Sequence, residues 1–87
     1  MIVLRSKQFV KEIEKLPLKI RDIFKEKIEL FYDNPYNPIF RNHKLKGSLR
    51  NYRSINITGD YRAIYEEYSE DVITFTRIGT QSELYGN

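Results

Sequence analysis

The hydrophobic periodicity of the chain changes near Pro38, from the spacing typical of helices to the alternation typical of strands. Before this point, apolar residues recur every three or four positions along two stretches, 6–16 and 18–33, which are separated by Pro17. This spacing places the apolar side chains of each stretch on one side of a helix. Ser6 is a favourable N-cap for the first stretch. We therefore predict two amphipathic helices, each with one face toward a core.

The second half of the chain has the two-residue period of strands. Residues 52–58 alternate, with Ile55 and Ile57 on one face. Residues 61–68 are rich in tyrosine, and residues 72–78 combine Val, Ile, Thr and Phe, which favour extended structure. Short polar turns join the three segments, so they are predicted to form an antiparallel meander.

These patterns predict an α+β fold, in which two N-terminal helices pack on one face of a small twisted antiparallel sheet. Residues 1–5 are short and β-branched and are expected to form an edge strand, and the tail is expected to close as a short helical turn. A chain of 87 residues fits one domain, 1–87. The helices cover one sheet face, so polar and aromatic residues are expected to gather on the other.

Composition excludes several kinds of functional site. The chain has no cysteine and a single histidine, His43, which excludes disulfides, thiolate zinc sites and a site built on several histidines. No metal or other cofactor is expected. No stretch approaches 18 apolar residues, and the first five residues are too short for the apolar region of a signal peptide. We therefore expect a cytoplasmic protein that makes no membrane contact.

Positive charge is concentrated in one segment. Residues 41–53 hold five basic side chains and no acid, whereas the rest of the chain holds 10 basic and 12 acidic residues. The segment therefore carries more than the whole net charge of +3. Such a local field suits a polyanion such as a nucleic acid, although a solvated basic loop is the simpler alternative.

Four short motifs of the C-terminal half carry a resemblance to a known family. They are HKLKG at 43–47, YRS at 52–54, GDYRAIY at 59–65 and IGTQSELY at 78–85. Together they resemble the RelE/ParE toxin superfamily, and most closely its YafQ-like branch of messenger-RNA interferases. The match covers roughly residues 36–86 by motif, whereas the N-terminal strand and helices fit by layout.

The resemblance implies a function as well as a fold. In that family, the sheet face opposite the two helices cuts messenger RNA on the ribosome, and an antitoxin from the neighbouring gene covers the site. This chain is therefore expected to be the toxin of a type II toxin–antitoxin system. Its expected partners are a cognate antitoxin and ribosome-bound mRNA, with no small-molecule cofactor.

Metal-free RNA cleavage needs a base for the 2′-hydroxyl, cations for the phosphoryl charge and an acid for the leaving oxygen. The unperturbed pKa of histidine suits His43 to the role of base, and the surrounding positive charge favours its neutral form. An exposed loop histidine is the alternative. Asp60 is explained by turn chemistry when taken alone. The resemblance assigns Asp60 to the site, as proton acceptor or as a group that orients His43.

Two positions depart from the family pattern. Gln81 and Asn56 stand where relatives commonly have histidine, and neither side chain exchanges a proton at neutral pH. If Gln81 replaces the general acid, the typical contribution lost is about 10²–10⁴-fold, and activity is expected to be weakened. Arg62, Arg77 and Tyr85 are the groups expected to supply the remaining catalysis, and we count Arg62 and Tyr85 with the catalytic set.

A second set of residues is predicted to bind RNA. Lys44 and Lys46 are the most plausible phosphate contacts, since they alternate about Leu45. Arg53, Arg62 and Arg77 are expected to form a cationic patch on adjacent strands. Tyrosines are candidates for base stacking, with core packing expected for about half of them. The predicted RNA-binding residues are Lys44, Lys46, Arg50, Arg53, Asn56, Tyr61 and Arg77.

Two alternatives of other functional classes remain open. The first is a non-nucleolytic toxin like those of the ParE branch, which act on DNA gyrase, and the loss of histidine at Gln81 and Asn56 is compatible with it. The second is an RNA-binding or antitoxin-titrating module of the same fold. His43, Asp60 and the basic segment favour RNA as the target.

Overall fold

The computed structural model of the protein describes residues 1–49 and 51–86. Its elements are, in chain order, β1 (Ile2–Arg5), α1 (Lys7–Glu14), α2 (Leu18–Asp33), η1 (Pro38–Phe40), β2 (His43–Lys44), η2 (Gly47–Leu49), β3 (Tyr52–Asn56), β4 (Tyr61–Glu67), β5 (Val72–Thr80) and α3 (Gln81–Tyr85). The predicted helices, meander and closing turn are confirmed. β2 and the two 3₁₀ turns were not predicted, because segments of two or three residues leave no periodicity.

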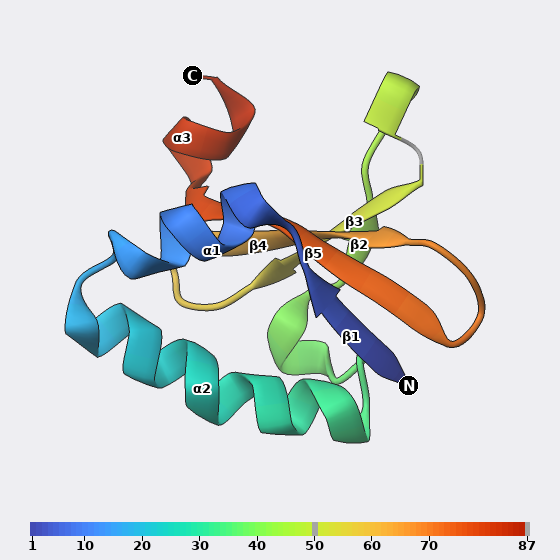
Figure 1. The fold of residues 1–87 in the computed structure, drawn as a ribbon, viewed down its shortest axis with the longest axis horizontal. Helices are drawn as coiled ribbons and strands as arrows, with labels where there is room; N and C mark the ends of the chain where they lie inside the picture. Colours follow the sequence, from blue (N-terminus) through green and yellow to red (C-terminus); the bar gives the residue numbers. More distant parts are fainter. Residues whose placement is uncertain (50, 87) are drawn as a thin grey trace.

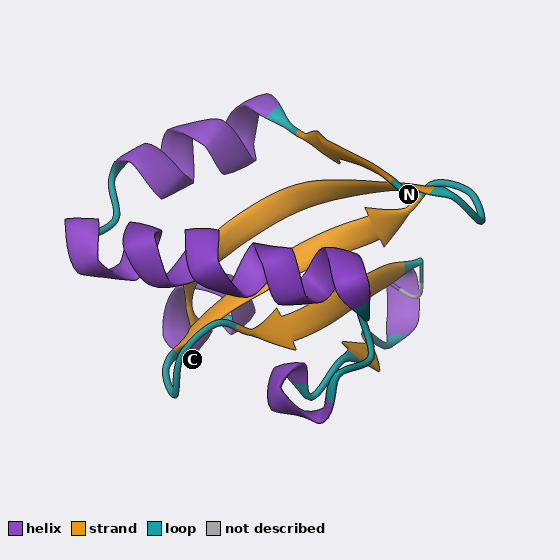
Figure 2. Ribbon diagram, turned by 90° about the horizontal axis from the view of Figure 1, so that it is seen from below, coloured by secondary structure: helices purple, strands orange, loops and turns teal. Residues whose placement is uncertain are grey.

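The elements form two layers (Figure 1). Helix α2 crosses beneath the sheet and α1 runs along the β5 side of it, whereas α3 rises from the opposite face (Figures 1 and 2). Helix α1 starts where predicted, because the Ser6 hydroxyl accepts a hydrogen bond from the Phe9 amide at 3.0 Å. None of the helices in the described residues is long and apolar enough to cross a membrane.

The sheet has the strand order β1-β5-β4-β3-β2. The three strands of the meander and β2 pair antiparallel, but β1 pairs parallel with β5, with Ile2 opposite Val72 and Arg5 opposite Phe75. The prediction of a wholly antiparallel sheet is therefore corrected for this edge strand. The two helices that follow β1 carry the chain away before β2, so no tight turn dictates an antiparallel partner.

Aromatic rings fill the space between the helices and the sheet. Phe75 of β5 lies 5.4 to 5.8 Å, between ring centroids, from Phe9, Phe24, Phe31 and Tyr65. Pairs at this separation add stabilisation beyond the area that they bury. The predicted inward residues of β3, Ile55 and Ile57, belong to the same core.

A β-bulge changes which side chains of β5 face this core. Ile64 pairs with Arg77, but the next residue, Tyr65, pairs with Phe75, so Thr76 is an extra residue in β5. Strict alternation would place Arg77 on the same face as Phe75. The bulge shifts the period by one, so that Ile78 is buried in the core and Arg77 reaches the opposite face.

Candidate active site

The sheet face opposite α2, here called the open face, is defined by cross-strand pairs, since paired residues point to the same side. Its three rows are Asn56, Arg62 and Gly79; His43, Ser54, Ile64 and Arg77; and Tyr52, Glu66 and Thr74. Most of the predicted catalytic residues belong to this face or border it. The polar residues of these rows are on the side predicted for them, but the prediction is wrong for the aromatic residues Tyr61, Tyr65 and Phe75, which face the core.

His43 lies in the two-residue strand β2, is exposed, and is directly opposite Ser54. Its Nδ1 is 2.9 Å from the Arg41 carbonyl oxygen. A carbonyl only accepts, so Nδ1 carries the proton and donates it, and the lone pair of the neutral ring is at Nε2. The ring is therefore oriented with Nε2 as its proton acceptor, and Nε2 has no hydrogen bond to another residue that the structure describes.

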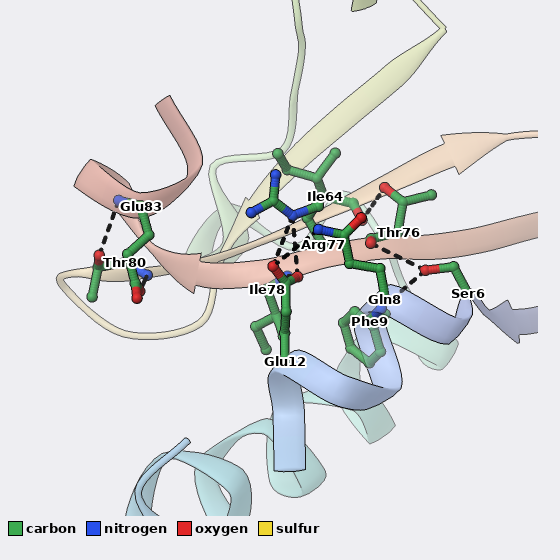
Figure 3. A network of polar contacts seen from close by, with 10 residues as sticks. All are labelled: Ser6, Gln8, Phe9, Glu12, Ile64, Thr76, Arg77, Ile78, Thr80 and Glu83. Atoms are coloured by element: carbon green, nitrogen blue, oxygen red, sulfur yellow. Dashed lines mark hydrogen bonds and ion pairs between the residues drawn. The ribbon is translucent and has the colours of Figure 1, made fainter. Parts of the chain in front are cut away.

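Tyr85 meets the same row from above the sheet. Its hydroxyl is 2.5 Å from the Ser54 hydroxyl oxygen, and Cβ atoms of paired residues such as Ser54 and His43 are about 4.5–5.5 Å apart. Thr80 starts α3 with a capping box, because its hydroxyl accepts from the Glu83 amide and the Glu83 carboxylate accepts from the Thr80 amide (Figure 3). This cap directs α3, and with it Tyr85, back over the open face.

The hydrogen bonds of that cap also affect the acidity of Glu83. The bond from the Thr80 backbone amide, followed by the side-chain bond to Thr80, lowers the pKa of Glu83 from its ordinary value. The carboxylate form therefore holds α3 in place. Gly79 contributes space, since a Cβ there would lie 3.0 Å from the Glu83 carboxylate oxygen.

Asp60 and Gln81 are brought together by the backbone. The Gln81 amide donates to the Asp60 carbonyl oxygen at 3.0 Å, so the β3–β4 turn is tied to the start of α3. The Asp60 side chain is exposed, and the turn is shaped by the Thr58 hydroxyl, which accepts from the Asp60 and Tyr61 amides. Both the turn interpretation and the site interpretation of Asp60 are compatible with this geometry.

Arg62 lies opposite Asn56, and Asn56 is half-buried. One terminal nitrogen of Arg62, Nη1, donates to the carbonyl oxygens of Thr58, Gly59 and Tyr61 at 3.0 to 3.2 Å. These carbonyls orient the guanidinium without neutralising it. Arg62 is therefore a positioned cation beside the predicted site.

Arg77 is held differently. Its Nε donates to both carboxylate oxygens of Glu12, at 2.9 and 3.2 Å, and the Ile78 amide donates to one of them at 3.0 Å (Figure 3). Glu12 thus joins α1 to the edge of β5. The charge of Arg77 is matched by this carboxylate, so Arg62 has more positive charge to offer an anion.

Several predicted RNA-binding residues lie away from the open face. Lys44 pairs with Arg53, and Arg53 with Tyr65, which places this row on the helix-covered side. Arg53 donates to Asn42, stacks over Tyr36 with 5.3 Å from its Cζ to the ring centroid, and lies 3.9 Å from a Glu67 oxygen. The expectation that Arg53, Arg62 and Arg77 form one cationic patch is therefore not met for Arg53.

The other residues predicted to bind RNA do not share one location. Lys46 is exposed before η2, and Arg50 lies outside the described residues. Tyr61 packs against the core, and Tyr65 is part of it. Burial raises the pKa of the Tyr65 hydroxyl, which accepts a hydrogen bond from Asn42. Among Tyr61, Tyr65 and Tyr85, Tyr85 is the one that lies over the open face.

Sequence reasoning missed three residues beside the site. Ser54 has a weak signal, because it alternates with Asn56 along β3. Arg41 has no signal beyond its place in the basic segment. Lys27, which lines one pocket with Asn56 and Arg62, has no signal because its position belongs to the polar side of α2. Among the described residues, there is no group of three or more His, Cys, Asp or Glu side chains able to hold a metal ion.

Known proteins of similar sequence identify the family of this chain. The profile of the YafQ family, described as a bacterial toxin of type II toxin–antitoxin systems, matches residues 2–86. The mRNA interferase toxin YafQ of Escherichia coli is 28% identical over 85 residues, which cover 93% of this chain and 91% of that protein.

Solved structures extend this likeness to three dimensions. The crystal structure of Escherichia coli YafQ superposes with a TM-score of 0.81, at 26% identity and 97% coverage of both chains. A chain of the RelB–RelE antitoxin–toxin complex from Methanococcus jannaschii gives a TM-score of 0.74, at 31% identity and 95% coverage of both. The resemblance seen in the sequence motifs is confirmed, and the chain belongs to the YafQ toxin family of type II toxin–antitoxin systems.

Proposed function

We propose that this protein is an mRNA interferase toxin, a metal-independent endoribonuclease that cuts ribosome-bound messenger RNA in the cytoplasm. The observation that carries the proposal is the row of His43 and Ser54 with Tyr85 above it. It combines an imidazole whose Nε2 is free to accept a proton with a phenol fixed 2.5 Å from the Ser54 hydroxyl. The relative that shares 28% identity bears the same activity in its name.

The proposed reaction uses the 2′-hydroxyl of the RNA as nucleophile. Nε2 of His43 accepts its proton while the 2′-oxygen attacks the adjacent phosphorus, and the bond to the 5′-oxygen breaks, leaving a cyclic phosphate. Arg62 balances the charge that builds on the phosphoryl oxygens. Asp60 assists the base, either by orienting His43 or by accepting the proton.

The leaving oxygen needs a proton from another group. Gln81 is at the position that the resemblance assigns to the acid, but an amide cannot donate its proton at neutral pH. Tyr85 places a phenol beside the His43 row, where it bonds the Ser54 hydroxyl and can donate a hydrogen bond to the leaving oxygen. We therefore propose a nuclease that is slower than relatives with histidine at this position, whose rate depends mainly on positioning and charge.

A cognate antitoxin is the proposed partner. The open face and its border combine exposed His43 and Asp60 with the cation of Arg62. An acidic or helical segment that complements this charge would block access of RNA. A complex that leaves residues 43–62 and 77–85 fully uncovered would contradict this form of inhibition.

Cleavage of a defined message on purified ribosomes, mapped by primer extension, tests the nuclease. His43→Ala and Asp60→Ala are each expected to lower kcat by about 10²–10⁴-fold. Tyr85→Phe is expected to lower kcat by about tenfold, the value of one hydrogen bond of about 1.4 kcal/mol. Tyr68→Phe is the matched control, because Tyr68 is 77% exposed at the β4–β5 turn.

Two outcomes would overturn the assignment. The first is wild-type cleavage that persists in His43→Ala, which would remove the base from the mechanism. The second is a wild-type protein that cuts no message yet inhibits growth, which would favour the non-nucleolytic, ParE-like alternative that Gln81 and Asn56 keep open.

A further inference from the structure

A pocket of about 390 Å³ lies beside the candidate active site, where the edge of β3 is no longer covered by β2. It is bordered by α2, the end of η1 and the β3–β4 turn. Its lining includes Lys27, Ile39, Arg41, Asn56, Thr58 and Arg62. Asn56 and Arg62 also belong to the open face, so the pocket is continuous with the proposed RNA site.

The charge of this pocket is positive and unmatched. It brings together Lys27 of α2, Arg41 at the end of η1 and Arg62 of β4, and none of the described residues that line it is acidic. The ion pairs found within residues 1–49 and 51–86 join Arg53 to Glu67 and Arg77 to Glu12, so they leave the pocket cations out. Like charges held around one cavity repel each other, and a bound anion would relieve that repulsion.

Arg41 gives a second, independent sign that the pocket has a use. Its φ of 46° places it in the left-handed region, and no other non-glycine residue among those described has a positive φ. Glycine and asparagine are the residues that adopt this conformation most readily. A non-glycine residue at such a position strains the backbone whatever its use, and such strain concentrates at functional sites.

The same backbone conformation connects the pocket to the catalytic base. The Arg41 carbonyl accepts the hydrogen bond from Nδ1 of His43 at 2.9 Å, while the Arg41 side chain lines the pocket. One residue thus orients the imidazole through its backbone and adds charge to the pocket through its guanidinium. An anion bound there would lie on the β3 side of the site.

We propose that this pocket binds a backbone phosphate of the RNA, next to the phosphate that is cut, with Lys27 and Arg41 as its contacts from outside the sheet. The inference rests on the proposed nuclease function and specifies the path of its substrate across the free edge of β3. Guanidinium groups pair with phosphate oxygens in a bidentate manner, and lysine adds a point charge. An acidic antitoxin segment is the competing occupant. RNA is favoured because Asn56 and Arg62 belong both to the pocket and to the open face, so one strand of RNA can contact both.

The test measures binding of a single-stranded RNA oligonucleotide that spans the cleavage site. Its 2′-oxygens are methylated, so the nucleophile is blocked. Lys27→Gln and Arg41→Gly are compared with wild type between 50 and 200 mM salt, conditions over which phosphate contacts weaken measurably. Arg41→Gly removes the guanidinium but keeps a residue that adopts positive φ. Lys25→Gln is the control on the same helix, at an exposed position outside the pocket.

We expect Lys27→Gln and Arg41→Gly each to weaken binding by about 3–10-fold at low salt and to reduce the slope of log K against log salt by about 0.7, the value for one phosphate contact on a single strand. Lys25→Gln is expected to match wild type. Ribosomal cleavage by Lys27→Gln should show a raised KM with kcat nearly unchanged, because the contact is the same in ground and transition states.

Contrary results separate the two proposals. If wild type cuts the message and Lys27→Gln equals Lys25→Gln in affinity and slope, the phosphate pocket is wrong and the nuclease stands. If Lys27→Gln weakens the antitoxin complex but not RNA binding, the occupant is the antitoxin and the proposal is overturned. If wild type neither binds nor cuts RNA, the proposed function itself fails, and the pocket assignment fails with it.

Discussion

The two faces of the sheet are built on different principles. On the helix-covered face, Phe75 touches four other aromatic rings and is fully buried. On the open face, His43 is exposed and has one hydrogen bond to a backbone carbonyl. The first face provides folding free energy through burial, whereas the second carries exposed polar groups such as His43, which contribute little to stability.

This difference separates stability from chemistry within one thin sheet. Apart from the bulge in β5, each strand contributes alternate residues to the two faces, so a change at an exposed open-face position is expected to alter chemistry and leave stability nearly unchanged. Ser54 and Ile55 are neighbours in β3, yet the first bonds Tyr85 and the second belongs to the core. Three experiments, taken from the largest expected effect to the smallest, test how complete this separation is.

The largest effect is expected from Phe75→Ala. Removing this ring from the centre of the aromatic cluster should lower the free energy of unfolding by about 3–5 kcal/mol, because the cavity cannot be filled by its neighbours. That is a large fraction of the stability of a small domain, about 5–15 kcal/mol. Urea denaturation followed by circular dichroism measures it, with His43→Ala as the open-face control.

His43→Ala should change the free energy of unfolding by less than about 0.5 kcal/mol, as expected for an exposed side chain. Equal losses in the two variants would show that the open face also supports the fold. The separation of stability from chemistry would then be wrong.

The next effect is a gain of function at Gln81. If this position holds the general acid in relatives with histidine, Gln81→His should raise kcat for ribosomal cleavage by up to about 10²-fold, the lower end of what proton transfer contributes. Binding of the message should change little, because proton donation matters in the transition state. Primer extension with timed samples measures the rate.

Ser82→His is the matched control, since Ser82 is the adjacent exposed residue of α3. An equal gain from Ser82→His, or no gain from Gln81→His over a measurable wild-type rate, would show that Gln81 is not at an acid position.

The smallest effect concerns the pH dependence of α3. The pKa of Glu83 is lowered by its bonds to Thr80, so the carboxylate stabilises the folded cap above the ordinary glutamate pKa of 4.5. That contribution is lost as the pH falls through the lowered pKa. The Thr80 amide resonance, measured by NMR between pH 6 and pH 3, should move with this titration.

Glu83→Gln is the control, because glutamine also fits a capping box but does not titrate. Its Thr80 amide should stay constant over the same range. A wild-type resonance that is equally constant would mean that the cap does not depend on the charge of Glu83.

Periodicity predicted the buried face well, because burial is what imposes the period. The apolar positions of α2 and the inward pair Ile55 and Ile57 follow from it directly. The bulge at Thr76 does not follow from periodicity, because Thr76 favours a strand as its neighbours do, and nothing in the sequence marks it as the extra residue. The side of Arg77 depends on that bulge, so its place on the open face was not derivable from alternation.

The site was predictable only in part. Motif resemblance pointed to His43, Asp60 and Tyr85, but a two-residue period does not say which half of the alternation faces the helices, and Arg53 lies on the other side. Lys27 reaches the pocket from α2 only through tertiary packing. No pattern in a single sequence brings a helix residue to the edge of a strand.

The outer edge of β5 has a consequence for how these molecules behave in a crowded solution. Strand β1 covers this edge only as far as Phe75, and unpaired backbone groups at a sheet edge invite another chain to add a strand. Here the Phe75 and Thr76 carbonyls accept from Ser6, the Ile78 amide donates to Glu12, and the Thr80 amide donates to Glu83. The Ser6 amide and three side chains of the same molecule thus occupy the positions that a neighbouring strand would need, which protects this edge against aggregation.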